Sequence, residues 1–436
     1  MHMEWISRHR PHNARPPRRW PWLAAVPLAA CLAAAYPAAA AASGTAASAP
    51  NTCGSGKGPS CYTPQEYQVA YGVAPLLSRG VDGSGETVVF PELAASAPAT
   101  DIRQDLATFD STFGLPPASL QVVNTIAGSA TPYLANDEEV QDTEIAHAMA
   151  PDATLDVVLV PQQDESSVAS LVAAMAKVVQ TGVTLHAAVI SVSASIGEQS
   201  LTSSEVAQMN AAMEQASQQH ITVVASSGDA GAIADDGPPV QVSLPASDPL
   251  VLAVGGTTLD AANPAGTYLG EMAWNEGTEA SGGGYSSLFS RPSYQDGVAR
   301  AGATRGVPDV AANADGSTGM ALAFSDGDIQ AATGTSASAP LWAGVIALAD
   351  QEAGHHLGFV NPAIYAVARG PAYHRAFHDV VTGDNSVLWP TGVFVGYNAG
   401  PGWDPVTGWG SPDAPVPRPA TGAYSPLGGA VSRAGT

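Results

Sequence analysis

Short apolar runs alternate with stretches of helical periodicity along most of this chain, between residues 66 and 410. Short runs rich in aliphatic and β-branched residues are typical of buried strands. They predict strands at Thr87–Phe90, Thr154–Val160, Ala188–Ser193, Ile221–Ala225 and Leu250–Val254. Because helical stretches separate these runs, the pattern indicates an α/β fold, with a parallel sheet covered by helices on both faces.

The spacing of apolar residues also predicts helices between and after these strands. We expect them at Ser167–Val179, at Glu205–His220 and from Ser336 to Ala349. Thr202 and Glu205 have the spacing of a capping box at the start of the second helix, and Pro340 falls in the first turn of the third, where a missing N–H costs little. No linker-like stretch or internal repeat interrupts the pattern, so we predict a single domain.

The first 42 residues have the composition of a secretory signal. Five arginines precede an apolar, alanine-rich run from Trp20 to Ala42, so we expect residues 1–42 to be removed and the protein to be secreted. An alternative stays open, because Leu28-Ala29-Ala30-Cys31 resembles a bacterial lipoprotein processing box, and a lipid on Cys31 would anchor the protein at the cell envelope. Residues 413–436 are rich in Pro and Gly and are expected to form a disordered tail.

Two cysteines, Cys53 and Cys61, would remain in a short N-terminal segment over residues 43–61. In an oxidising compartment they would form a local disulfide, worth roughly 2–3 kcal/mol where the segment is otherwise ordered. Their spacing is not the Cys-x-x-Cys of a redox pair, and no further metal ligands lie close by. We therefore expect the disulfide.

Acidic residues dominate the charge of the chain, with 16 basic and 39 acidic residues and a net charge of −23. Residues 1–42 contain five of the basic residues and one of the acidic ones, so the mature chain would carry 11 and 38, a net charge of −27. Such acidity argues against nucleic acid and anionic membranes as partners. We expect a monomer without membrane contact, unless it is lipid-anchored at Cys31, and a fold that tolerates acid because protonation relieves self-repulsion.

A candidate nucleophile lies in the string Gly334-Thr335-Ser336-Ala337-Ser338-Ala339-Pro340. This string resembles the way in which subtilisin-like folds present a nucleophilic serine, here Ser336, at the start of a helix. The histidine base of such enzymes stands in His-Gly-Thr or His-Gly-Ser, and the chain contains neither string. Because a serine needs a base to attack a carbonyl, either another base serves here or the site is inactive.

Two acids at helical spacing supply a candidate base. Asn136 can cap a helix on which Glu138 and Asp142 are four residues apart and share a face. The apolar positions of this helix are Val140, Ile145, Ala148 and Met149. Two such carboxyls do not both ionise easily, so one pKa rises and the pair could exchange a proton with a serine. A solvated acidic first turn is the alternative, and His147 points off the shared face and is expected to be structural.

A third acid, Asp229, follows a predicted strand in the string Val223-Val224-Ala225-Ser226-Ser227-Gly228-Asp229. Its loop lies at the carboxyl end of the strand, where open parallel sheets gather their chemistry. A buried, protonated Asp229 could donate a hydrogen bond to an oxyanion, alongside the backbone N–H of Ser336. The alternative is a turn residue that bonds its own backbone.

Together these strings resemble the sedolisin family of serine-carboxyl peptidases, which have a subtilisin-like fold with a glutamate in place of the histidine. Further matching strings are Ile145–Pro151, Ser227–Asp229, Trp274-Asn275, Gly282–Gly284 and Arg305–Ala311. The strings occur in the family's order, from Tyr62 to Pro412. The resemblance implies one sedolisin-like peptidase domain over residues 62–412, with a parallel sheet sandwiched between helices.

The resemblance also implies a role for each acid. Ser336 would be the nucleophile, and Glu138 the general base and later the acid. Asp142 would orient Glu138 and balance its charge, while Asp229 would stabilise the oxyanion. Glu92, at the end of a predicted strand, matches a carboxyl that extends the hydrogen-bond network in some relatives, although an ordinary strand-end acid is an equal alternative.

One structural Ca²⁺ near the C-terminal end is a further implication of the resemblance. The ligands would be the carboxylates of Asp379 and Asp404 and the carbonyls of Val380, Gly400 and Gly402. Calcium prefers six to eight oxygen ligands, and a glycine-rich turn lets backbone carbonyls point inward. Without the resemblance, the segment around Asp404 would be interpreted as a plain turn.

The function expected from these residues is that of a secreted endopeptidase that cuts proteins and peptides at acidic pH. Two alternatives stay open: a catalytically inactive relative that serves as a secreted binding protein, and a tripeptidyl-peptidase. Relatives usually carry a large propeptide that assists folding, whereas only a short stretch separates the signal from Tyr62 here. We therefore expect the domain to fold unaided or with help from another source.

Overall fold

A mainly parallel sheet forms the centre of the computed structural model, which describes residues 61–93, 100–124, 134–160, 167–261 and 265–414. Within these residues the sheet has eight strands, in the order β13-β12-β8-β6-β1-β5-β3, with β16 also paired to β12. Their bounds are β1 Thr87–Leu93, β3 Ser119–Asn124, β5 Thr154–Val160, β6 Val189–Val192, β8 Thr222–Ser226, β12 Leu252–Asp260, β13 Gly270–Ala273 and β16 Val310–Asn313. Every pairing is parallel except that of β12 with β13.

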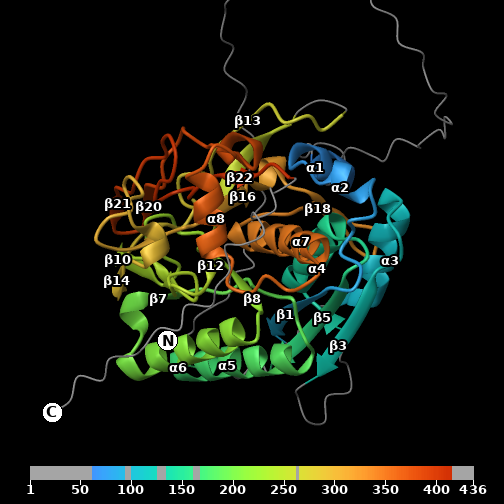
Figure 1. Ribbon diagram of the computed structural model, residues 1–436, viewed down its shortest axis with the longest axis horizontal. Helices are drawn as coiled ribbons and strands as arrows, with labels where there is room; N and C mark the ends of the chain where they lie inside the picture. The colour runs from blue at the N-terminus through green and yellow to red at the C-terminus, as the bar shows by residue number, and fades with distance from the viewer. Residues whose placement is uncertain (1–60, 94–99, 125–133, 161–166, 262–264, 415–436) are drawn as a thin grey trace, which may run out of the picture. The chain divides into compact units, whose positions relative to one another are not determined.

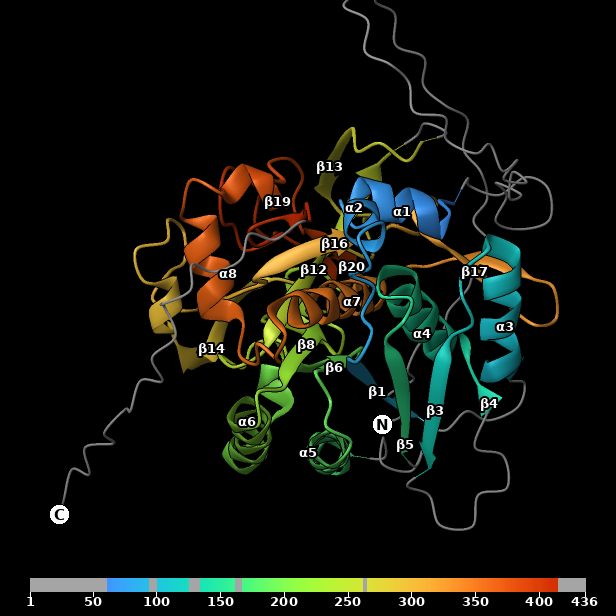
Figure 2. The same cartoon turned by 45° about the vertical axis from the view of Figure 1, so that its right-hand side comes forward.

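Helices cover both faces of this sheet, as Figure 2 shows. On one face lie α5 (Val168–Thr184) and α6 (Ser203–Gln218), and on the other lie α4 (Asp137–Met149) and α7 (Thr335–Ala353). The predicted capping box at the start of α6 is present, with both Thr202–Glu205 hydrogen bonds made. Covering both faces explains why β6 and β8 are buried at every residue instead of at every second one.

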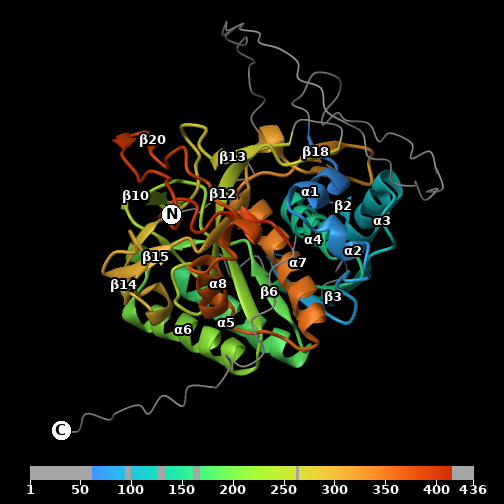
Figure 3. The ribbon, with the colours of Figure 1, turned by 45° about the horizontal axis from the view of Figure 1, so that its top comes forward.

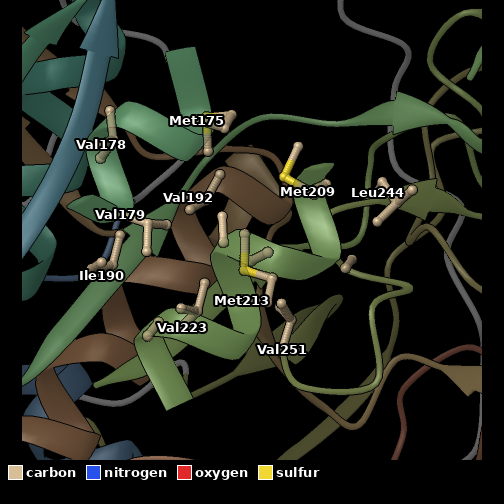
Figure 4. Close-up of a cluster of buried hydrophobic side chains, with 14 of the residues drawn as sticks. Met175, Val178, Val179, Ile190, Val192, Met209, Met213, Val223, Leu244 and Val251 are labelled. Carbon is tan, nitrogen blue, oxygen red and sulfur yellow. The ribbon is translucent and has the colours of Figure 1, made fainter. Parts of the chain in front are cut away.

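The core between α5, α6 and the sheet consists of aliphatic and methionine side chains (Figure 4). Its labelled members are Met175, Val178, Val179, Ile190, Val192, Met209, Met213, Val223, Leu244 and Val251. Each is at most 6% exposed. Burying a side chain of this size contributes about 1.5–3 kcal/mol, so this layer is a main source of the fold's stability.

On the opposite face, α4 and α7 pack directly against each other (Figure 1). A Cβ added to Gly344 of α7 would lie 2.6 Å from the Cβ of Met149 in α4, so only glycine permits this approach. α7 is buried nearly all round, and its Trp342 Nε1 donates to the carbonyl of Ala311, 2.8 Å away. The two helices that carry Glu138 and Ser336 are therefore held rigidly together.

Smaller elements complete the described region around α4 and α7 (Figure 3). Those near α4 are α1 (Pro64–Ala70), α2 (Ala74–Leu77) and α3 (Ile102–Phe113). α8 (Asn361–Ala368) follows α7 in the chain. In this part of the chain no helix is long and apolar enough to cross a bilayer.

The predicted α/β fold is confirmed, and each predicted strand and helix is present, with its start within two residues of the predicted one. β12 continues to Asp260, six residues beyond the predicted end, because its glycines at 255 and 256 pair with β16 instead of ending the strand. Of the two acids for which a solvated turn was the alternative, Asp142 is 0% exposed and so is not solvated, whereas Glu138 is partly exposed.

Several predictions fall outside the described residues. These are the signal over residues 1–42, the processing box at Cys31, the segment with Cys53, and the tail from residue 415 onward. Cys61 is buried at the start of the described chain. The Cys53–Cys61 disulfide stays a prediction.

Candidate active site

Ser336 occupies the first turn of α7, two residues after Gly334, which caps the helix with a left-handed backbone. Gly334 has a φ of +82°, and a Cβ there would lie 2.6 Å from Asp229 Oδ2 and 3.2 Å from Ser336 Oγ. The two side chains therefore flank the same glycine, and only a residue without a side chain allows them to do so.

Glu138 reaches the same serine from the first turn of α4. Asn136 caps this helix, and Glu139 completes a capping box with it, which fixes the direction in which Glu138 leaves the turn. Burial raises the pKa of Glu138 to about 7; a side-chain hydrogen bond with Ser336 opposes the rise, and the charges of nearby acids add to it. Glu138 is thus a far stronger base than a free glutamate, whose pKa is about 4.3.

Asp142 lies one turn further along α4 and is completely buried. Ser193, at the end of β6, donates its hydroxyl to Asp142 Oδ2 at 2.8 Å. Glu92, in β1, shares a side-chain hydrogen bond with Asp142, and burial raises the pKa of both carboxyls well above the usual range. The charge of Glu138 raises the pKa of Asp142 further, so the three acids titrate as one group.

Asp229 approaches from the loop after β8. Its Oδ1 accepts from both the backbone N and the Oγ1 of Thr335, each at 2.7 Å. Burial and the charge of Asp235 raise the pKa of Asp229 to about 7, although the hydrogen bonds from Thr335 oppose the rise. With Oδ1 engaged, Oδ2 is the oxygen that faces Gly334 and Ser336.

The structure brings Ser336, Glu138, Asp142, Asp229 and Glu92 into one cluster. His147 does not join it: its Nε2 lies 2.9 Å from Asp110 Oδ1 and 3.0 Å from the carbonyl oxygen of Pro116. The alternative interpretation of Asp229, as a turn residue that bonds its own backbone, is incomplete. Oδ1 of Asp229 accepts its hydrogen bonds from Thr335, in a distant segment.

Sequence reasoning missed three polar residues of this cluster, namely Ser193, Thr335 and Gln141. The last of these donates from Nε2 to Ser336 Oγ at 3.1 Å. A signal was present, because Gln141 lies three residues after Glu138 and shares its helix face. A search restricted to titratable side chains does not register an amide.

The five residues expected to bind calcium also come together, near the end of the described chain. Gly402 N donates to both carboxylate oxygens of Asp379 at 3.1 Å, and Gly400 N donates to Asp404 Oδ2 at 3.0 Å. The hydroxyl of Thr407 lies 3.1 Å from Asp404 Oδ2 and 3.4 Å from the carbonyl oxygen of Val380.

The carboxylates of Asp379 and Asp404 and the carbonyl of Val380 are oxygen ligands of the kind that a hard cation prefers. Burial raises the pKa of Asp404 to about 6, a cost that a bound cation would remove. Within the described residues no group of three or more Asp, Glu, His or Cys side chains has a metal-binding arrangement. A calcium ion here would depend on main-chain oxygens.

Comparisons with known proteins agree with this geometry. Residues 122–364 match the model of the subtilase family. The chain is 34% identical over 370 residues to kumamolisin from Bacillus sp. (strain MN-32), which covers 81% of this chain and 62% of that protein. It is 33% identical over 245 residues to tripeptidyl-peptidase 1 from Bos taurus, covering 50% of this chain and 40% of that protein.

A solved structure is similar over nearly its whole length. Pseudomonas sedolisin, a serine-carboxyl proteinase complexed with pseudo-iodotyrostatin, aligns with a TM-score of 0.70 and 30% identity, covering 83% of this chain and 96% of that one. By contrast, the chain spans less than two thirds of the length of the two curated relatives.

Proposed function

Because this chain belongs to the sedolisin family of serine-carboxyl peptidases, within the subtilases, we propose that it hydrolyses peptide bonds of proteins as an endopeptidase at acidic pH. The observation that carries this proposal is the convergence of Glu138, from α4, and Asp229, from the loop after β8, on the hydroxyl of Ser336. A base and a proton donor on either side of one hydroxyl meet the needs of acyl transfer.

In the first step, Ser336 Oγ attacks the scissile carbonyl while its proton passes to the Glu138 carboxylate. The hydrogen bond between these side chains supplies the path for that proton. Protonated Glu138 then gives the proton to the leaving amine, and in deacylation it takes one from water. A pKa of about 7 suits both roles, since the group can accept and release a proton near its working pH.

Asp142 and Glu92 support this exchange from behind Glu138. Their shared hydrogen bond and the hydroxyl of Ser193 hold a proton within the cluster, away from water. Two buried carboxyls linked in this way carry at most one negative charge between them at mildly acidic pH. Burial, together with the charges of Asp229 and Asp137, keeps the pKa of Glu138 high and so preserves its strength as a base.

Asp229 would act as the side-chain donor for the oxyanion. Since Oδ1 accepts two hydrogen bonds from Thr335, a proton on this carboxyl resides on Oδ2, the oxygen on the Ser336 side. Together with the backbone N–H of Ser336, it would stabilise the charge that develops on the carbonyl oxygen. Deprotonated Asp229 would repel that charge instead.

The mechanism needs opposite protonation states in its base and in its oxyanion donor, which predicts a bell-shaped dependence of kcat on pH. Glu138 must be ionised and Asp229 protonated, and burial raises the pKa of each to about 7. Because their charges repel, loss of one proton raises the pKa of the other group, and the active state is the singly ionised one. Activity is lost above neutrality, when both ionise, and in strong acid, when neither does.

The experiment is a degradation assay on an acid-denatured protein between pH 3 and pH 8, with Ser336→Ala and Glu138→Gln as matched variants. We expect both variants to lose activity by at least about 10³-fold while their folds persist. Equal, slow degradation by all three proteins would support the inactive binding protein instead.

Tripeptidyl-peptidase 1 among the relatives motivates a second candidate activity. A peptide with an acetylated N-terminus separates the two, since an endopeptidase cuts it internally whereas removal of N-terminal tripeptides needs a free amine. Mass spectrometry of the products would identify internal cleavage, which we expect.

One structural calcium ion is part of the proposal, held by the carboxylates of Asp379 and Asp404 and by the carbonyls of Val380, Gly400 and Gly402. The oxygen-only donor set supports it. Bound there, the ion would tie the loop after residue 378 to the turn at residues 400–404. It would have no part in peptide hydrolysis.

We also propose secretion with removal of residues 1–42, a disulfide between Cys53 and Cys61, and a monomer acting on protein or peptide substrates. Lipid attachment at Cys31 is the alternative, and it would leave the protein on the cell envelope. N-terminal sequencing and intact mass of the natural product distinguish them, because a lipidated chain begins at Cys31 and carries added acyl mass.

A further inference from the structure

Gln141 contacts the nucleophile directly, although no step of the mechanism above uses it. It lies on α4 three residues after Glu138, so both side chains point toward α7. Its Nε2 donates to Ser336 Oγ at 3.1 Å, and the residue is 6% exposed. A buried amide on the reacting oxygen calls for a chemical role as well as a packing role.

The orientation of this amide is fixed by its other end. Gln141 Oε1 accepts from the backbone N of Thr333 at 2.9 Å. Since a backbone N–H can only donate, the atom that faces it must be the amide oxygen, and the NH₂ group must face Ser336. The helix therefore presents an N–H, and not a carbonyl, to the nucleophile.

A donor at this position directs the hydroxyl proton. A serine hydroxyl has one O–H and two lone pairs. When one lone pair accepts from Gln141, the O–H is free to point at Glu138, and the other lone pair remains for attack on the carbonyl carbon. The amide thus selects the rotamer in which proton transfer to Glu138 is possible.

The same donor gains strength as the reaction proceeds. Negative charge builds on Oγ as its proton leaves, and hydrogen bonds to charged acceptors are roughly twice as strong as neutral ones. Gln141 carries no charge at any pH, so it stabilises Oγ without altering the protonation of the surrounding acids. A lysine or histidine there would neutralise Glu138 and Asp142 by pairing with them.

We propose that Gln141 is a catalytic residue that orients the Ser336 hydroxyl toward Glu138 and stabilises the charge that develops on Oγ. The proton moves from Oγ to the Glu138 carboxylate, the Oγ–C bond forms, and the carbonyl π electrons move to the oxyanion; Gln141 keeps its own protons throughout. This role rests on the proposed peptidase function.

Two substitutions separate the donor from its structural partner. Gln141→Met preserves length and volume but removes both hydrogen bonds. Gln141→Glu keeps the acceptor for Thr333 N and removes the permanent N–H donor, and it also adds a carboxyl beside Glu138. We expect each to lower kcat by roughly 10- to 100-fold, with KM within about threefold, because the interaction strengthens in the transition state.

Gln68→Met is the matched control. Gln68 is another buried glutamine on a helix near α4, 8% exposed, whose Nε2 donates to the carbonyl of Ala148 at 2.8 Å. Its loss is expected to lower the melting temperature about as much as Gln141→Met does, while leaving kcat and KM unchanged.

Retention of wild-type kcat within twofold by either Gln141 variant would overturn the role, as would a loss carried in KM instead of kcat. A matching loss of kcat in Gln68→Met would overturn it too, because the effect would then follow stability alone. A wild-type protein without Ser336-dependent activity would refute the proposed function itself, whereas an active wild type with unimpaired Gln141 variants would refute only this role.

Discussion

Asp350→Asn is expected to stabilise the protein at neutral pH and to leave it almost unchanged at pH 4. Asp350 lies in the last turn of α7 and is 0% exposed. Its Oδ1 accepts from the backbone N of Leu357 at 2.7 Å, while its Oδ2 is buried and has no hydrogen-bond partner among the described residues. Burial, opposed by the bond from Leu357 and reinforced by the charge of Glu86, raises the pKa of Asp350 to about 8.

The magnitude follows from the two states of this carboxyl. In the unfolded chain its pKa is about 3.9, so at pH 7 it is ionised, whereas in the folded protein it stays protonated. Folding at pH 7 therefore takes up a proton at a cost of up to about 4 kcal/mol, at about 1.4 kcal/mol for each of roughly three pH units. Because the fold raises the pKa of Asp350, the stability that its protonated form contributes is fully present below about pH 4. It is lost as the pH rises toward 8.

Asparagine is neutral at every pH and can still accept from Leu357 through Oδ1. The substitution should therefore raise the free energy of unfolding by about 2–4 kcal/mol at pH 7 and change it by less than about 1 kcal/mol at pH 4. Urea denaturation of both proteins at the two pH values measures this difference. An equal effect at pH 4 and pH 7 would refute the reasoning, because a change in packing alone does not depend on protonation.

A matched control is Asp309→Asn, at another fully buried aspartate. Asp309 accepts hydrogen bonds from Nη1 and Nη2 of Arg305, at 2.7 and 2.6 Å, in a buried ion pair. Its replacement should destabilise the protein at both pH values, by about 3–5 kcal/mol, since it leaves a buried Arg305 without its counter-charge. The two aspartates would then respond in opposite directions at pH 7.

Three further predictions concern the site and the calcium region. Asp229→Asn keeps an acceptor for Thr335 and carries a permanent N–H donor, so the fall of kcat above neutral pH should move upward by at least about one unit; an unchanged alkaline limb in the pH–rate profile would contradict the role of Asp229. Glu138→Gln should abolish activity yet raise the free energy of unfolding at pH 8 by roughly 1–3 kcal/mol, because burial raises the pKa of Glu138 to about 7; urea denaturation of the two proteins checks this, and a loss of stability would count against it. EGTA should lower the melting temperature by several degrees, and adding Ca²⁺, but not Mg²⁺, should restore it. Asp404→Asn should remove this response to EGTA. A melting temperature that EGTA does not change would argue against the calcium ion.

The sequence allowed prediction of the elements whose pattern is local. The strand over Thr154–Val160 matches β5 residue for residue, because a short run rich in valine and leucine is typical of a buried strand. The helix of Glu138 was predicted from its cap and apolar positions, but its burial was not. Its acids give it the composition of a surface helix, and only the packing of α7, α3 and α1 around it covers them.

The acids of the site were predictable from the sequence, because their residue type alone indicates their chemistry. Residues whose role depends on where the fold places them were not predictable. Glu138 and Asp142 could be paired from their spacing, since carboxyls at i and i+4 have few ways to avoid each other. Ser193 could not, because hydroxyls are common and become significant only when a distant segment faces them. The direction of the Asp229 carboxyl depends likewise on Thr335, more than a hundred residues away.

Burial of acids connects catalysis in this protein with the conditions under which it is stable. The same desolvation that raises the pKa of Glu138 also raises those of Glu139, to about 8, and Glu271, to about 7, neither of which carries a step of the reaction. Each such group stays protonated in the fold at a pH where the unfolded chain has ionised, so each weakens the fold as the pH rises toward neutrality. A fold that keeps carboxyls protonated for proton transfer is therefore most stable in acid, where the high net negative charge is also reduced. A buried histidine base would reverse this dependence of stability on pH, since burial disfavours its charged form and the fold would be weakened in acid, where the unfolded chain binds the proton.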